Sequence, residues 1–164
     1  NPNAAGPDGE SPLIPALRNG RSAVVRALLA AGATPDQEAI DAALRYDRRD
    51  ALLAMIEAGA NPNTRNTWST KSLVELATEQ GDAQAVNMLL EHGANPTEAP
   101  NATPFSTPPL HVAVRNGDRE IVAILLEYGA DPGVRVGGWS AIEVAHNTNR
   151  PQIAEMLQDA ARER

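Results

Sequence analysis

A six-residue pattern, Leu-Leu-x-x-Gly-Ala, occurs four times along this chain of 164 residues, once with Met55-Ile56 in place of the two leucines. Its glycines are Gly32, Gly59, Gly93 and Gly129, so successive copies lie 27, 34 and 36 residues apart. Self-similarity at a period of about 20 to 50 residues is typical of arrays that stack one small structural repeat. The pattern therefore predicts a chain assembled from several copies of a single supersecondary motif.

A second pattern precedes each copy and is clearest over residues 107–117, which read Thr-Pro-Pro-Leu-His-Val-Ala-Val-Arg-Asn-Gly. Ser or Thr followed by Pro favours the start of a helix, and Gly117 favours its end. The next segment carries apolar residues at helical spacing, as at Ile121, Val122 and Leu125. Each repeat is thus predicted to be a helix, a tight turn and a second helix. One such pair cannot bury its apolar face alone, so neighbouring copies must stack.

Together the two patterns resemble the ankyrin repeat, with its Thr-Pro-Leu-His-x-Ala start and Leu-Leu-x-x-Gly-Ala-Asp/Asn end in about 33 residues. The resemblance covers roughly residues 8–160 and includes a fifth, partial copy that begins at Gly138. It implies an all-α solenoid of about five stacked helix-turn-helix units with short β-hairpin fingers, forming a single domain over residues 1–164. The predicted repeats span residues 8–36, 37–63, 64–96, 97–132 and 133–160.

The second repeat departs from this pattern. It has Glu38-Ala39-Ile40-Asp41 where Thr-Pro-Leu-His is expected, and Asp47 replaces its inter-helix glycine. The spacing of 27 residues before Gly59 is about six short of the family period. The missing residues fall between Asp36 and Gln37, where a finger belongs. We therefore predict that the finger between the first two repeats is absent or vestigial.

Composition narrows the possible functions. The chain has no Cys, which excludes disulfides and thiol nucleophiles, and its net charge is −7 without a dense Lys/Arg run, which argues against a nucleic-acid partner. No apolar run approaches the ~18–20 residues of a membrane helix, so we expect a soluble chain without membrane insertion. It opens at Asn1-Pro2-Asn3 without Met, which is compatible with a trimmed cytoplasmic chain or with a removed leader and a periplasmic or secreted protein. The Ala- and Arg-rich, Lys-poor composition suggests a bacterial source.

No catalytic or metal-binding constellation is apparent. The chain lacks a Gly-rich phosphate loop, a Gly-x-Ser-x-Gly elbow and a His-Glu-x-x-His pair. Its three histidines, His92, His111 and His146, lie apart in the sequence. His111 occupies the histidine position of the family motif, where the resemblance implies that it orders the neighbouring turn. We therefore predict no enzymatic activity, no cofactor and no metal.

The carboxylates have ordinary interpretations. Asp41 and Arg45 are four residues apart on a predicted helix and are expected to form a surface pair. Glu75 and Glu79 are also four apart but carry the same charge. We interpret them as part of a solvated face, unless a cation of a partner lies between them.

The resemblance implies that a partner protein binds to the finger tips and to the exposed side of the first helices, which form a concave face in this family. Arginine recurs at this face in three of five copies. It would either bind an acidic segment of the partner in bidentate fashion or pair with carboxylates of its own chain, and both alternatives stay open. The residues just before each inter-helix turn are Arg18 and Asn19, Arg45 and Tyr46, Glu79 and Gln80, Arg115 and Asn116, and Asn147 and Thr148.

The aromatic residues add to this prediction, because none lies at a predicted core position. Trp68, Phe105 and Trp139 fall in the predicted finger loops, while Tyr46 and Tyr128 lie on helix ends. Exposed large aromatics are enriched in binding hot spots, although they can also pack on neighbouring fingers. We predict a partner-binding surface centred on the third to fifth repeats. Its residues are Trp68, Lys71, Phe105, Thr107 and Trp139 in the fingers, with Glu79, Gln80, Arg115, Asn116, Arg45 and Tyr46 behind them.

The predicted function is that of a non-catalytic protein-protein interaction module that is monomeric when free. A dedicated inhibitor, such as an immunity or protective protein for one enzyme or toxin, is a second hypothesis within the same class. A small-molecule-binding protein or an enzyme is the alternative from another class. It would require a closed cavity or a set of convergent titratable groups.

Overall fold

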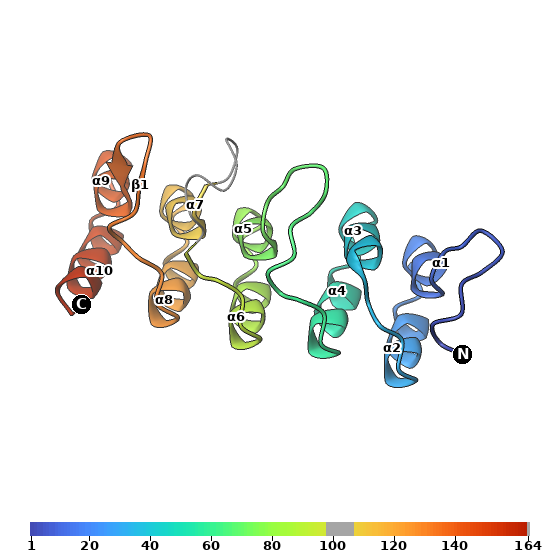
Figure 1. Cartoon of the computed structure of the whole chain (residues 1–164). Helices are drawn as coiled ribbons and strands as arrows, with labels where there is room; N and C mark the ends of the chain where they lie inside the picture. Colours follow the sequence, from blue (N-terminus) through green and yellow to red (C-terminus); the bar gives the residue numbers. More distant parts are fainter. Residues whose placement is uncertain (98–106, 164) are drawn as a thin grey trace. The chain divides into compact units, whose positions relative to one another are not determined.

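A computed structural model describes residues 1–97 and 107–163 and divides the chain into two compact units. Among the described residues, unit 1 (Asn1–Thr67) contains two helix pairs and unit 2 (Trp68–Arg164) contains three (Figure 1). The predicted fold class, an all-α array of about five helix-turn-helix repeats, is confirmed. That these five pairs form one domain over residues 1–164 stays a prediction.

Unit 1 consists of α1 (Leu13–Arg18), α2 (Ser22–Ala30), α3 (Gln37–Arg45) and α4 (Arg49–Glu57). The first helices, α1 and α3, pack against each other, and so do the second helices, α2 and α4. Each helix buries one apolar stripe between the two pairs, as stacking of repeats requires. The largest fully buried apolar side chains of this unit are Leu13, Leu17, Ile40, Met55 and Ile56.

Unit 2 repeats the same arrangement three times. The first helices α5, α7 and α9 pack in series, and the second helices α6, α8 and α10 form a parallel series (Figure 1). A short hairpin, β1–β2, precedes α9 and pairs Arg135 with Ser140 and Val136 with Trp139 in antiparallel register. The elements are α5 (Leu73–Glu79), α6 (Ala83–Glu91), α7 (Pro109–Asn116), α8 (Arg119–Glu127), β1 (Arg135–Val136), β2 (Trp139–Ser140), α9 (Ala141–Asn147) and α10 (Pro151–Arg162).

The connection between α2 and α3 contains no finger. The chain passes directly from α2 to α3 in Figure 1, and no strand is assigned in residues 31–36. Asp36 already caps α3, because its carboxylate accepts a hydrogen bond from the Ala39 backbone N–H at 2.9 Å. Earlier in the same connection, the Thr34 N–H donates a hydrogen bond to Asn3 Oδ1 at 2.8 Å. The predicted loss of the finger between the first two repeats is confirmed.

The turn within each helix pair requires one residue in the left-handed region. Gly81 and Gly117 supply it with φ of 69° and 85°, whereas Asp47 and Asn149 have φ of 54° and 55°. Asp and Asn adopt this conformation more readily than other residues with a Cβ, because their short side chains bond locally. Asp47 therefore does replace the inter-helix glycine of the second repeat.

Gly117→Ala is expected to lower the free energy of unfolding more than Gly81→Ala does. Both substitutions place a Cβ at positive φ, at a cost of about 1 kcal/mol each. A Cβ at Gly117 would lie 1.7 Å from Arg150 Nη1, whereas at Gly81 the nearest atom, Asp118 Oδ2, is 3.9 Å away. Arg150 must therefore move and give up its hydrogen bond to the Arg115 carbonyl oxygen, which adds about 1 kcal/mol. Urea denaturation measures both values, and equal losses would show that the Arg150 contact does not stabilise the stack.

Candidate functional site

The residue at one equivalent place in the first helix of several repeats forms a hydrogen bond with the backbone of the loop that follows that repeat. In unit 2, Glu75 Oε1 accepts a hydrogen bond from the Thr107 N–H at 3.1 Å, and His111 Nε2 donates one to the Trp139 carbonyl oxygen at 3.1 Å. Both Glu75 and His111 are buried. Burial lowers the pKa of His111 and so favours the neutral ring. His111 thus orders the neighbouring loop, as the family resemblance implies.

The prediction that Glu75 belongs to a solvated face is wrong. Its side chain is 1% exposed because it holds the same place in its repeat as His111 does in the next, where a backbone N–H requires an acceptor. Glu79 is exposed and forms an ion pair with Lys71. The two carboxylates therefore do not share one solvated surface, since Glu75 is bonded within the stack.

Asp41 holds the equivalent position in unit 1. Its side chain is buried, and Oδ1 accepts a hydrogen bond from the Thr67 backbone N–H at 3.2 Å. The prediction of a surface pair with Arg45 is therefore wrong in its placement of Asp41. The carboxylate faces the following loop because the Thr67 N–H needs an acceptor there.

Two tryptophan side chains of unit 2 are half exposed. Trp68 is 52% exposed and Trp139 is 51% exposed, in agreement with the prediction that neither belongs to the core. Trp139 lies in strand β2, and Trp68 lies in the loop that precedes α5. Large apolar side chains that remain this exposed contribute little to folding and are typical of binding surfaces.

The backbone at Trp139 is held from several directions. Its carbonyl oxygen accepts the hydrogen bond from His111, and Ser140 caps α9 in a capping box with Glu143. Arg135 closes the hairpin, because it bonds the Gly138 carbonyl oxygen at 3.0 Å and both carboxylate oxygens of Glu143 at 2.8 Å. The hydrogen bonds from Ser140 and Arg135 lower the pKa of Glu143. The Trp139 indole is therefore an exposed side chain on a fixed support.

The other predicted site residues of unit 2 lie near helix ends. Gln80, Arg115 and Asn116 are exposed, and Asn116 Nδ2 donates to the Thr78 carbonyl oxygen at 3.4 Å, which joins α7 to α5. Thr107 is half-buried, and its backbone N–H is the donor to Glu75. Phe105 lies outside the described residues. A role of these residues in binding stays a prediction.

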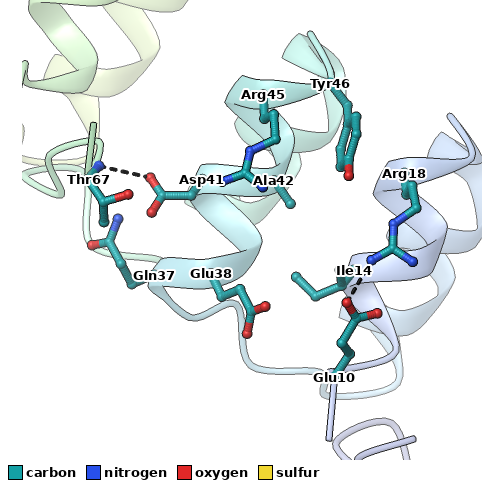
Figure 2. Close-up of a pocket in the computed structure, with 10 residues that line it drawn as sticks. All are labelled: Glu10, Ile14, Arg18, Gln37, Glu38, Asp41, Ala42, Arg45, Tyr46 and Thr67. Carbon is teal, nitrogen blue, oxygen red and sulfur yellow. Dashed lines mark hydrogen bonds and ion pairs between the residues drawn. The ribbon is translucent and has the colours of Figure 1, made fainter. Parts of the chain in front are cut away.

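A cleft of about 360 Å³ lies between α1 and α3 in unit 1 (Figure 2). It brings together the predicted residues Arg45 and Tyr46 with Arg18, which bonds Glu10 at 2.6 Å. Hydrogen bonds with the Tyr46 hydroxyl and with Glu10 raise the pKa of Arg18. Arg18 thus pairs with a carboxylate of its own chain, which was one of the two alternatives for the arginines. Glu38, which also lines the cleft, was not predicted as a site residue.

The described part of the chain offers no metal site, since no three His, Cys, Asp or Glu side chains converge in residues 1–97 and 107–163. Nor does it contain a helix long and apolar enough to cross a membrane.

These features define a helical repeat protein that presents side chains from its loops and helix ends. Comparison with family models identifies ankyrin repeats (three copies) over residues 40–136 and 74–163, and the chain belongs to the ankyrin-repeat family. It is also 33% identical over 88 residues to an ankyrin repeat-containing protein of the bacterium Treponema pallidum (strain Nichols). That match covers 49% of this chain and 29% of the relative, so the chain corresponds to less than a third of the length of that protein. Ankyrin repeats are generally protein-protein interaction modules and are typically non-catalytic.

Proposed function

We propose that this chain is a non-catalytic module that binds a partner protein through the loops and first-helix ends of unit 2. The observation that carries this proposal is the Trp139 indole, which is 51% exposed on a backbone bonded by His111 and by the capping box at Ser140. A rigid aromatic anchor binds with a small loss of conformational entropy, which is the usual property of a hot spot.

Trp68 and Arg115 extend this surface. Trp68 is as exposed as Trp139, and Arg115 presents its side chain from the end of α7. Tryptophan and arginine are the residues most enriched in interface hot spots. The same surface would suit a scaffold or a dedicated inhibitor of one enzyme or toxin equally well. The activity of the bound partner, assayed with and without the chain, distinguishes these two roles.

Capture experiments with the full chain as bait test the proposal. We expect a protein from an extract of the native organism to be retained by the wild-type chain and lost with Trp139→Ala. The matched control is Arg119→Ala with Glu127→Ala, which alters exposed residues on α8 instead. Retention is quantified by mass spectrometry. If the control abolishes retention and Trp139→Ala does not, the partner binds the second-helix side and the proposed surface is wrong.

A further inference from the structure

The cleft of unit 1 lies where the chain lacks a finger. In the second repeat, the polar side chain of Asp41 bonds the backbone of the following loop at Thr67. The equivalent residue of the first repeat is Ile14, and no finger follows it, because α2 leads directly into α3. In the first repeat this position therefore has no loop backbone to bond, and it is occupied by an apolar residue. The cleft has an apolar floor for this reason.

The shape of the cleft suits one long side chain. Ile14 and Ala42 lie on its floor, and Tyr46 extends into it from the end of α3 (Figure 2). Its volume of about 360 Å³ is at the lower end of the range of roughly 300–1,000 Å³ found for ligand pockets. Aliphatic stems of charged side chains pack readily on such apolar surface while their charged ends stay at its edge.

The charges that line the cleft favour a cation. Arg18 is already bonded to Glu10 at 2.6 Å, and Asp41 accepts the hydrogen bond from the loop. Glu38 is exposed, and its carboxylate has no hydrogen bond or ion pair with any other described residue. Three carboxylates and two guanidinium groups line the cleft, so the lining carries one net negative charge. Glu38 is therefore the carboxylate that a bound cation would neutralise.

We propose that this cleft binds the side chain of a lysine or arginine presented by an extended segment of the partner protein. The methylene groups pack on Ile14 and Ala42, and the cationic end bonds Glu38. The inference rests on the proposed function, because it assigns part of the partner's chemistry. At Arg18 it favours pairing within the chain over an acidic segment of the partner, since the Arg18 guanidinium is bonded to Glu10.

Titration of the full ¹⁵N-labelled chain with blocked tripeptides tests this inference by NMR. The probes are Ac-Gly-Arg-Gly-NH₂, Ac-Gly-Lys-Gly-NH₂ and, as the anionic control, Ac-Gly-Glu-Gly-NH₂. We expect the two basic peptides to shift the backbone amide signals of Ile14, Glu38, Ala42 and Tyr46 in a saturable manner, and added NaCl to weaken the effect. The glutamate peptide should leave these signals unchanged.

Glu38→Gln should raise the dissociation constant of the arginine peptide about three- to fivefold, as expected for loss of one partly exposed ion pair. The matched control is Glu57→Gln, which removes the same charge from an exposed position in α4 and should leave the constant unchanged. Preferential binding of the glutamate peptide, no saturable shift at these amides, or an equal effect of both substitutions would each overturn the proposal. The peptides report on this cleft alone, so their failure leaves the Trp139 capture result intact, and the converse also holds.

Discussion

Leu125→Ala is expected to lower the free energy of unfolding by about 2–5 kcal/mol, the usual cost of truncating a fully buried leucine. Leu125 is 0% exposed, and its helix, α8, packs against α6 on one side and α10 on the other. Truncation would leave a cavity between stacked second helices, which the neighbouring repeats cannot fill without losing their own packing. Urea denaturation followed by circular dichroism measures the loss.

Two further substitutions make this test specific. Leu126→Ala, at the adjacent and only half-buried position, should cost clearly less, whereas Leu90→Ala in α6, where the leucine is 4% exposed, should again cost about 2–5 kcal/mol. Near-zero losses at both Leu125 and Leu90 would contradict the placement of these side chains between stacked repeats. Unfolding should stay cooperative, because each repeat depends on its neighbours for burial.

The helices and turns could be predicted because each copy of the repeat needs the same helical pattern and the same turn conformation. Apolar residues such as Val122 and Leu125 recur in the copies with helical spacing, and Gly117 marks a turn that needs positive φ. The copies therefore support the same assignment independently. The missing finger was also predictable, since the spacing between Gly32 and Gly59 is shorter than the others by about the length of a hairpin. Length and periodicity are properties of the sequence alone.

The buried carboxylates could not be predicted in this way. Glu75 and Glu79 look alike by spacing and by residue type, and only the position of the Thr107 N–H decides that Glu75 is buried. Such hydrogen bonds join residues that are far apart in the sequence, so no periodic pattern reports them. A partial signal was available, because Glu75 falls at the position that His111 occupies in the clearest copy of the motif.

The two candidate surfaces also differ in how far the sequence could predict them. Exposure of Trp68 and Trp139 was predictable, because both lie outside the helical pattern that defines the core. The cleft of unit 1 was not, since it combines Glu10, which precedes α1, with Glu38 and Tyr46 at opposite ends of α3. The short connection between the first two repeats was the available signal for it. A repeat without its finger leaves the neighbouring first helices uncovered.

Trp139→Ala is expected to weaken binding of the captured partner by about 2 kcal/mol or more, which corresponds to roughly a 30-fold rise in the dissociation constant. The loss should be large because the indole is presented by a hairpin that Arg135 and Glu143 hold in place, so little entropy is lost when it binds. Trp68→Ala should have an effect of similar size if both side chains enter the same interface. Isothermal titration calorimetry with the purified partner measures both constants.

These binding losses count only if the variants remain folded. The contacts that fix Trp139 are made by its backbone and by its neighbours, including the carbonyl oxygen bonded by His111, so removal of the half-exposed indole should leave the melting temperature unchanged. The control Arg119→Ala with Glu127→Ala should leave the dissociation constant close to the wild-type value and lower the melting temperature only slightly, because it removes two exposed side chains and one exposed hydrogen bond, from Arg119 to Gln152. Unchanged affinity in both tryptophan variants, at unchanged stability, would mean that the exposed aromatics of unit 2 are not the anchors of this module.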